Sequence, residues 1–60
     1  MLVAKNLGRE ILIEQENECG RRLLGRILMN QVTAIERTSG IGKVVIHFQS
    51  GFLVVDKLED

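Results

Sequence analysis

Residues 21–38, RRLLGRILMNQVTAIERT, carry the strongest periodic pattern in this 60-residue chain. On a helix at 100° per residue, the aliphatic side chains occupy one continuous arc and the arginines occupy the opposite arc. The apolar arc spans roughly 180°, which is wider than the ~100° that a surface helix needs against a single core. The pattern therefore predicts an amphipathic helix from Arg21 to Thr38 that packs against its own sheet and against a second surface.

Two residues interrupt the apolar arc. Gly25 lies at its edge, and because an interior glycine costs a helix ~1 kcal/mol relative to alanine, we expect another backbone to approach closely there. Gln31 lies in the middle of the arc, where a buried amide must be paired. We expect Gln31 either to select one oligomer register or to hydrogen-bond to a nearby loop.

The C-terminal part of the chain predicts a β-hairpin. Its strands are Lys43–Phe48 and Phe52–Lys57, and residues 49–51 form a three-residue loop in which Gly51 can adopt a positive φ. Alternation places apolar side chains on both faces of this hairpin. Since one helix can cover only one face, the other face is expected to contact a partner.

The N-terminal part predicts a second hairpin, formed by Leu2–Lys5 and Arg9–Glu14 around a turn that contains Asn6 and Gly8. In the alternative interpretation, the central helix extends back to Leu7, because apolar residues recur at multiples of four. Such a helix would contain two glycines and an asparagine, which are costly in a helix interior. The hairpin is therefore preferred.

Together these segments predict one α+β domain over residues 1–60, in the order ββαββ, with the central helix packed on a small antiparallel sheet. A chain of this length buries only about 60% of its unfolded surface. Its single cysteine cannot form an internal disulfide, and no Cys/His cluster can hold a structural metal. We therefore expect a homodimer or higher oligomer. The expected interface residues are Leu24, Leu28, Gln31, Val32, Ile35, Val45 and Val55.

Eight basic and eight acidic side chains give a formal net charge of zero. Nucleic-acid binding rests largely on neutralising phosphates and is usually carried by basic domains, so it is not favoured. The sequence contains no run long enough to span a bilayer and does not begin like a signal peptide. An unpaired cysteine fits a reducing compartment. We expect a cytoplasmic protein with no membrane contact.

The polar arc of the predicted helix is the candidate binding site, with Arg22, Arg26, Arg37 and Asn30 on one face. Such a face could hold an anion, meaning a phosphate, a nucleotide or an acidic patch on a partner protein. It could equally be a solvated face on which Glu18 and Arg22 pair at i, i+4, a contact worth ~0.3 kcal/mol.

The sequence offers little for catalysis. His47 is the one side chain that titrates near neutral pH, and Asp56 could lie near it across the hairpin, but a strand histidine without a catalytic role is the simpler interpretation. Cys19 could be an activated thiolate beside Arg21 and Arg22, although a small thiol that fills a gap is more common. No cofactor or metal site is predicted, and an enzyme is not expected.

The first thirteen residues, MLVAKNLGREILI, resemble the opening of the carbon storage regulator family of small RNA-binding translational repressors. The match consists of the apolar start, a basic turn, Gly8, Ile11 and Ile13, and it implies an intertwined, β-rich dimer. The family's alanine-proline segment and RNA-contacting arginine have no counterpart in this proline-free chain, so no RNA-binding residue is carried over. Residues 23–59 are similar in style to small bacterial helix-plus-hairpin proteins of unknown function, which implies a fold and no activity.

These observations predict a non-enzymatic, homo-oligomeric regulatory or adaptor protein of bacterial or phage type that acts by protein–protein interaction. Two alternatives stay open. One is an RNA- or DNA-binding regulator that uses the basic helix face. The other is a small-ligand sensor with a pocket at the oligomer interface.

Overall fold

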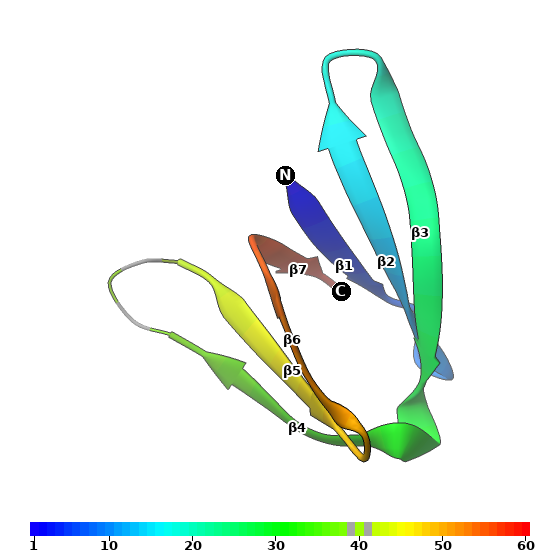
Figure 1. The fold of residues 1–60 in the computed structure, drawn as a ribbon, viewed down its shortest axis with the longest axis vertical. Helices are drawn as coiled ribbons and strands as arrows, with labels where there is room; N and C mark the ends of the chain where they lie inside the picture. The colour runs from blue at the N-terminus through cyan, green and yellow to red at the C-terminus, as the bar shows by residue number, and fades with distance from the viewer. Residues whose placement is uncertain (39, 41) are drawn as a thin grey trace.

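The computed structural model describes residues 1–38, 40 and 42–60, and within them the chain forms seven β-strands and one short 3-10 turn (Figure 1). These ranges contain no α-helix, and therefore no helix that is long and apolar enough to cross a membrane. The predicted α+β fold in the order ββαββ is therefore wrong, and so is the helix-plus-hairpin fold that the likeness of residues 23–59 implied. The elements are β1 (Leu2–Asn6), β2 (Glu10–Asn17), β3 (Gly20–Leu28), η1 (Met29–Gln31), β4 (Val32–Arg37), β5 (Val44–Phe48), β6 (Gly51–Val55) and β7 (Lys57–Glu59).

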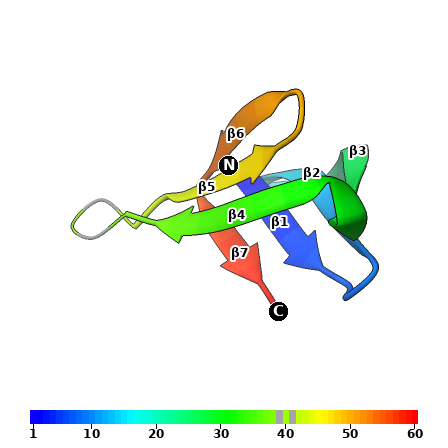
Figure 2. The same cartoon turned by 90° about the horizontal axis from the view of Figure 1, so that it is seen from below.

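The strands form two sheets. Sheet A has four strands in the order β3-β2-β1-β7, where β7 runs parallel to β1 and the other pairs are antiparallel. Sheet B has three antiparallel strands in the order β4-β5-β6. Figure 1 shows β3 and β4 at the two outer sides of the molecule, and Figure 2 shows β3 and β6 rising on the side opposite β7.

The segment predicted as one helix is instead β3, η1 and β4, and two β-bulges explain why its sequence resembles a helix. Leu24 is an extra residue in β3, between the partners of Ile13 and Glu14 on β2. Thr33 is an extra residue in β4. Each bulge shifts the two-residue alternation of a strand by one place, and η1 turns the chain between them. The apolar residues consequently recur at intervals of three and four, which is helical spacing, although the backbone is extended.

Both predicted hairpins are confirmed, except that the second strand of the C-terminal one ends at Val55 and Lys57 belongs to β7 in sheet A. The alternative helix back to Leu7 is wrong. In the first turn Gly8 has φ 91°, and its amide donates to Asn6 Oδ1 at 2.8 Å. In the second hairpin Phe48 pairs with Gly51, so the loop has two residues rather than the predicted three. Local turn chemistry therefore placed these elements correctly.

The core lies between the inner faces of the two sheets. Sheet A contributes Ala4, Ile11 and Ile13, and sheet B contributes Val44, Ile46 and Val55. The chain crosses from sheet B to sheet A at Asp56, the one residue between β6 and β7. Asp56 accepts a bond from the Leu2 amide through Oδ2 at 2.7 Å and donates its own amide to the Leu2 carbonyl at 2.9 Å. Lys43 Nζ donates to Asp56 Oδ1 at 2.7 Å, which ties the start of β5 to the same corner.

The outer face of sheet A is covered by charged side chains rather than by a second layer. Arg21 on β3 donates from Nη1 and Nη2 to the two carboxylate oxygens of Glu59 on β7, each at 2.8 Å. It also lies 3.5 Å from Glu14 and 3.4 Å from Glu16. Val3 is fully buried but does not belong to the core between the sheets, and its strand neighbours Glu14 and Lys57 lie on this face. Arg21 and its carboxylate partners therefore cover apolar surface as well as pairing charge.

Truncation of Ile46 tests the placement of the core. Because Ile46 is fully buried, we expect Ile46→Ala to lower the free energy of unfolding by about 2–5 kcal/mol and Ile46→Val by about 0.5–1.5 kcal/mol. Leu7→Ala, at an exposed turn, should change it by less than about 0.5 kcal/mol. Urea unfolding at one fixed chain concentration measures all three. Equal losses for Ile46→Ala and Leu7→Ala would contradict the core.

Candidate functional site

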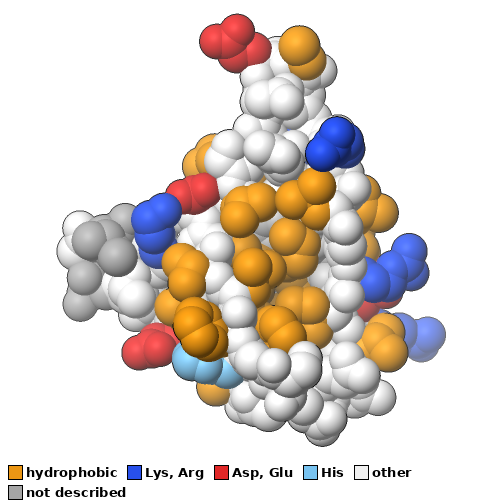
Figure 3. Space-filling model, viewed as in Figure 1, with side chains coloured by type: hydrophobic (Ala, Val, Ile, Leu, Met, Phe, Trp, Pro, Cys, Tyr) orange, Lys and Arg blue, Asp and Glu red, His pale blue; other side chains and the backbone are white. Residues whose placement is uncertain are grey.

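An open groove of about 330 Å³ lies between the two sheets, on the face of the molecule shown in Figure 3. Leu2, Ile13 and residues 24–27 line it from sheet A, and Phe48 and Leu53 line it from sheet B. Figure 3 shows apolar side chains gathered at the centre of this face, with charged side chains at its periphery. A volume of this size is at the lower end of the range for binding sites. An apolar centre with a polar rim is also the usual composition of a protein interface.

Gly25 and the bulge at Leu24 create the hollow. Gly25 pairs with Ile13, so no side chain stands opposite that isoleucine on the inner face of sheet A. A Cβ at Gly25 would meet no atom within 4 Å, and the backbone there does not have a positive φ. The expected close approach of another backbone at Gly25 is therefore wrong, because the missing side chain leaves space. Leu24, the bulged residue, stands at the rim with 47% of its surface exposed.

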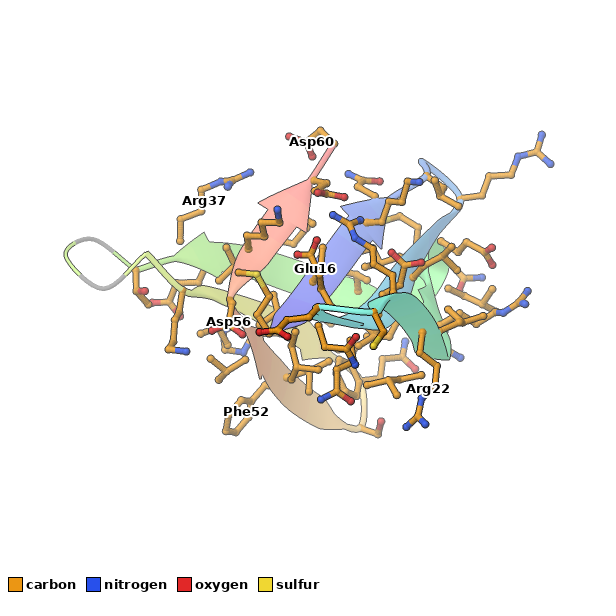
Figure 4. The ribbon with its side chains drawn as sticks, turned by 90° about the horizontal axis from the view of Figure 1, so that it is seen from above. Glu16, Arg22, Arg37, Phe52, Asp56 and Asp60 are labelled. Atoms are coloured by element: carbon orange, nitrogen blue, oxygen red, sulfur yellow. The ribbon has the colours of Figure 1, made fainter. Side chains whose placement is uncertain are left out.

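Two arginines of β3 are close to groove residues along the chain: Arg26 follows Gly25, and Arg22 precedes Leu24 by two positions. Arg26 is one of its lining residues and lies 3.5 Å from Glu10. Arg22 pairs with Gln15 on β2, and Figure 4 shows its side chain pointing to the same side of the molecule as Phe52. Within the described ranges Arg22 forms no ion pair. It is therefore a cation available to an acidic group of an occupant.

The structure does not bring the predicted anion-binding residues together. Arg22 and Arg26 pair with Gln15 and Leu12, which lie on opposite faces of β2. Asn30 is in η1. Arg37 ends β4, lies 3.8 Å from Asp60, and points to the side opposite Arg22 in Figure 4. These four residues would share one face only if residues 21–38 formed a helix, and the observed strands and turn place them apart.

The predicted oligomer-interface residues are also dispersed. Leu24 lines the groove. Leu28 is 47% exposed on the other face of β3, since it pairs with Glu10, and Ile35 is 37% exposed on β4. Gln31 is exposed in η1, Val32 packs partly against the core, Val45 is half-buried on the outer face of β5, and Val55 is in the core with 1% exposed. Surface remains available at Leu24, Leu28 and Ile35, but these positions do not form one patch.

The two candidate catalytic residues lie apart from the groove. His47 Nε2 is 3.2 Å from Glu36 Oε1, and its ring centre is 6.2 Å from that of Phe52. Asp56, expected near His47, is instead bonded to Lys43 and Leu2. Cys19 is exposed at the β2–β3 turn rather than filling a gap. In the described part of the chain no group of three His, Cys, Asp or Glu side chains is arranged so that it could hold a metal ion.

Of the residues that line the groove, only Leu24 and Arg26 are among the predicted site residues; the others are Leu2, Ile13, Gly25, Ile27, Phe48 and Leu53. The signal for the hollow would have been Gly25, because a glycine inside a strand marks a bulge or an open position. The helical interpretation of the segment concealed that signal.

In comparisons with known proteins, no family model, no curated protein and no solved structure matches this chain. The resemblance of residues 1–13 to the carbon storage regulator family therefore stays a prediction.

Two carboxylates make the stability of the fold dependent on pH. The Arg21 guanidinium, with a smaller contribution from Lys57, lowers the pKa of Glu59 from 4.5 to about 2. The hydrogen bond from Lys43, and then that from the Leu2 amide, lowers the pKa of Asp56 below its ordinary value. A carboxylate whose pKa is lower in the folded state stabilises the fold above its unfolded pKa. That contribution is lost as the pH falls through the folded pKa.

We therefore expect the urea midpoint to be constant from neutral pH down to roughly 4.5 and to fall between there and about 2. Glu59→Gln should lower the midpoint at pH 7 and make the acid loss less steep. Glu18→Gln, at the exposed β2–β3 turn, should change neither. A wild-type midpoint as high at pH 2.5 as at pH 7 would contradict this assignment.

Proposed function

We propose that this protein is a small, non-enzymatic, homo-oligomeric adaptor of regulatory type that acts by binding other proteins. The open groove between the two sheets carries the proposal. Its lining is aliphatic and aromatic except for Arg26, and the titratable residues considered for catalysis lie elsewhere. Such a surface binds by burying apolar side chains and has no group positioned for chemistry.

The occupant that fits this groove is an apolar segment of a protein partner that also carries an acidic residue. The apolar lining would receive the partner's aliphatic or aromatic side chains. Arg22 beside the groove would pair with the carboxylate, and this pairing favours an acidic segment over a neutral or basic one.

Self-association is supported by the remaining exposed apolar side chains. Among the described residues eight large ones have 37–66% of their surface exposed, and most lie outside the groove. A formal net charge of zero means that copies of the chain do not repel one another strongly. The exposed free thiol of Cys19 is consistent with work in the cytoplasm. Neither alternative is favoured: the basic residues for nucleic-acid binding do not share a face, and the groove lies within one chain.

Filling the groove should weaken peptide binding without unfolding the protein. Panning a displayed library of random peptides on the wild type should enrich peptides that combine apolar and acidic residues. Gly25→Val places a side chain in the hollow, so we expect the selected peptides to bind roughly tenfold more weakly or worse, equivalent to ~1.4 kcal/mol. The same change should leave stability unchanged or raise it by up to about 1 kcal/mol, because valine is the better strand residue.

Leu7→Val, outside the groove, is the matched control and should bind the peptides like the wild type. If Gly25→Val keeps full peptide binding, or if no peptide is enriched over an unrelated protein, the groove is not the binding site.

Sedimentation equilibrium tests self-association separately. At micromolar to millimolar chain concentration, we expect an average mass above the 6.8 kDa of one chain that rises with concentration. A folded species that stays at 6.8 kDa over the whole range would contradict self-association, but it would not contradict peptide binding at the groove.

A further inference from the structure

Sheet B ends in an exposed edge strand. In β4, Val32 is half-buried and every later residue is exposed. An edge strand presents a row of backbone N–H and C=O groups that another strand can pair with. Natural proteins commonly block such edges with charged residues (lysine above all), proline, a β-bulge or a very short strand. β4 has six residues and contains neither lysine nor proline, its charged residues are one acidic and one basic, and its bulge at Thr33 lies near its start, so residues 34–37 run as a regular strand.

The other edges are less suited to pairing with a second copy. β7 has three residues, and two of them, Lys57 and Glu59, are charged. β6 is tied to β1 at its end, where the Asp56 amide donates to the Leu2 carbonyl. β3 is long and exposed, but it carries three arginines. Two antiparallel β3 strands would bring three arginines from each copy to one seam, and like charges brought together there destabilise a sheet.

The face alternation of β4 selects one register for an antiparallel pair. Directly opposed residues must lie on the same face of a continuous sheet, so the symmetry axis must pass through a residue rather than between two residues. An axis at Glu36 would oppose two carboxylates. An axis at Ile35 places Ile35 opposite the partner's Ile35 and Glu36 opposite the partner's Ala34, while Arg37 faces the bulge at the partner's Thr33. No two like charges face each other in this register.

The same register continues the apolar rows of each sheet. Within one chain, Ile46 lies between Ile35 on β4 and Leu53 on β6. With the axis at Ile35, this row runs unbroken through Ile35 into the partner's Ile35 and onward. Cross-strand aliphatic contacts of this kind are the unit of sheet stabilisation. An axis at Ala34 would instead set Ile35 opposite the partner's Thr33 and interrupt the row.

We propose that two copies of this chain pair antiparallel through β4, about a two-fold axis at Ile35, and join their three-stranded sheets into one six-stranded sheet. The inference rests on the self-association in the proposed function and assigns it a surface. β4 contributes nothing to the lining of the groove. The dimer therefore keeps both grooves open for protein partners, which suits an adaptor.

A pair of lysine substitutions tests the surface. Ile35→Lys sets two ammonium groups against each other at the axis, and we expect the dimer dissociation constant to rise about 100-fold or more. Val54→Lys is the matched control, since Val54 is 40% exposed against 37% for Ile35 and lies on β6. It should sediment like the wild type. Circular dichroism checks that each variant folds.

A cysteine at the axis tests the register even if Ile35→Lys does not fold. In a Cys19→Ser background, Ile35→Cys treated with oxidised glutathione should give a covalent dimer within the reversible one, and Val54→Cys should not. An oligomeric wild type whose Ile35→Lys form is folded and still dimeric, or an Ile35→Cys that crosslinks no better than Val54→Cys, overturns the β4 pairing alone. A wild type that stays monomeric at every concentration overturns both this pairing and the proposed oligomer.

Discussion

The fold depends on the corner at Asp56. One residue separates β6 in sheet B from β7 in sheet A, so the chain must change sheets without a loop. The side chain and the amide of Asp56 both bond to Leu2, and Lys43 holds the same carboxylate. These contacts fix β1, β5 and β6 at one place and set the inner faces of the two sheets against each other. The six core residues lie between those faces.

The groove is the part of these inner faces that the core leaves uncovered. Leu24, Phe48 and Leu53 line this groove and are not fully buried, and Gly25 supplies no side chain to close the hollow opposite Ile13. A sixty-residue chain has few residues with which to cover two sheets. In the proposed adaptor, a partner protein covers the groove and a second copy covers the edge of β4. The two surfaces are separate, so binding at one does not require loss of the other.

Charge is used for local pairing more than for a binding field. Arg21 forms ion pairs with Glu14, Glu16 and Glu59 above the buried Val3, and Lys43 forms an ion pair with Asp56 at the corner between the sheets. These ion pairs engage Arg21 on the outer face of sheet A and Lys43 at the junction of the two sheets. Arg22 is different, because it lies beside the groove and forms no ion pair within the described ranges. Arg22 is therefore the reason why we propose that the occupant of the groove carries an acidic residue.

The sequence by itself determined the two hairpins, β1–β2 and β5–β6. Their turns depend on Gly8 and Gly51, and their alternation places Ile11, Ile13, Val44 and Ile46 on inner faces, so the information is local. It also indicated that apolar surface would be left over, since Leu24, Leu28 and Ile35 are exposed as the expected oligomer would require.

Only the tertiary structure decided the state of residues 21–38 and hence the site. β3 forms because β2 offers it a backbone partner along its length, and a bulge at Leu24 sets which side chains reach the groove. With a second bulge at Thr33 and the turn at η1, apolar residues of this segment recur every three or four positions, as they would on an amphipathic helix. Pairing between strands and the register shifts within it are long-range contacts. A periodicity measured along one segment cannot distinguish an amphipathic helix from two bulged strands.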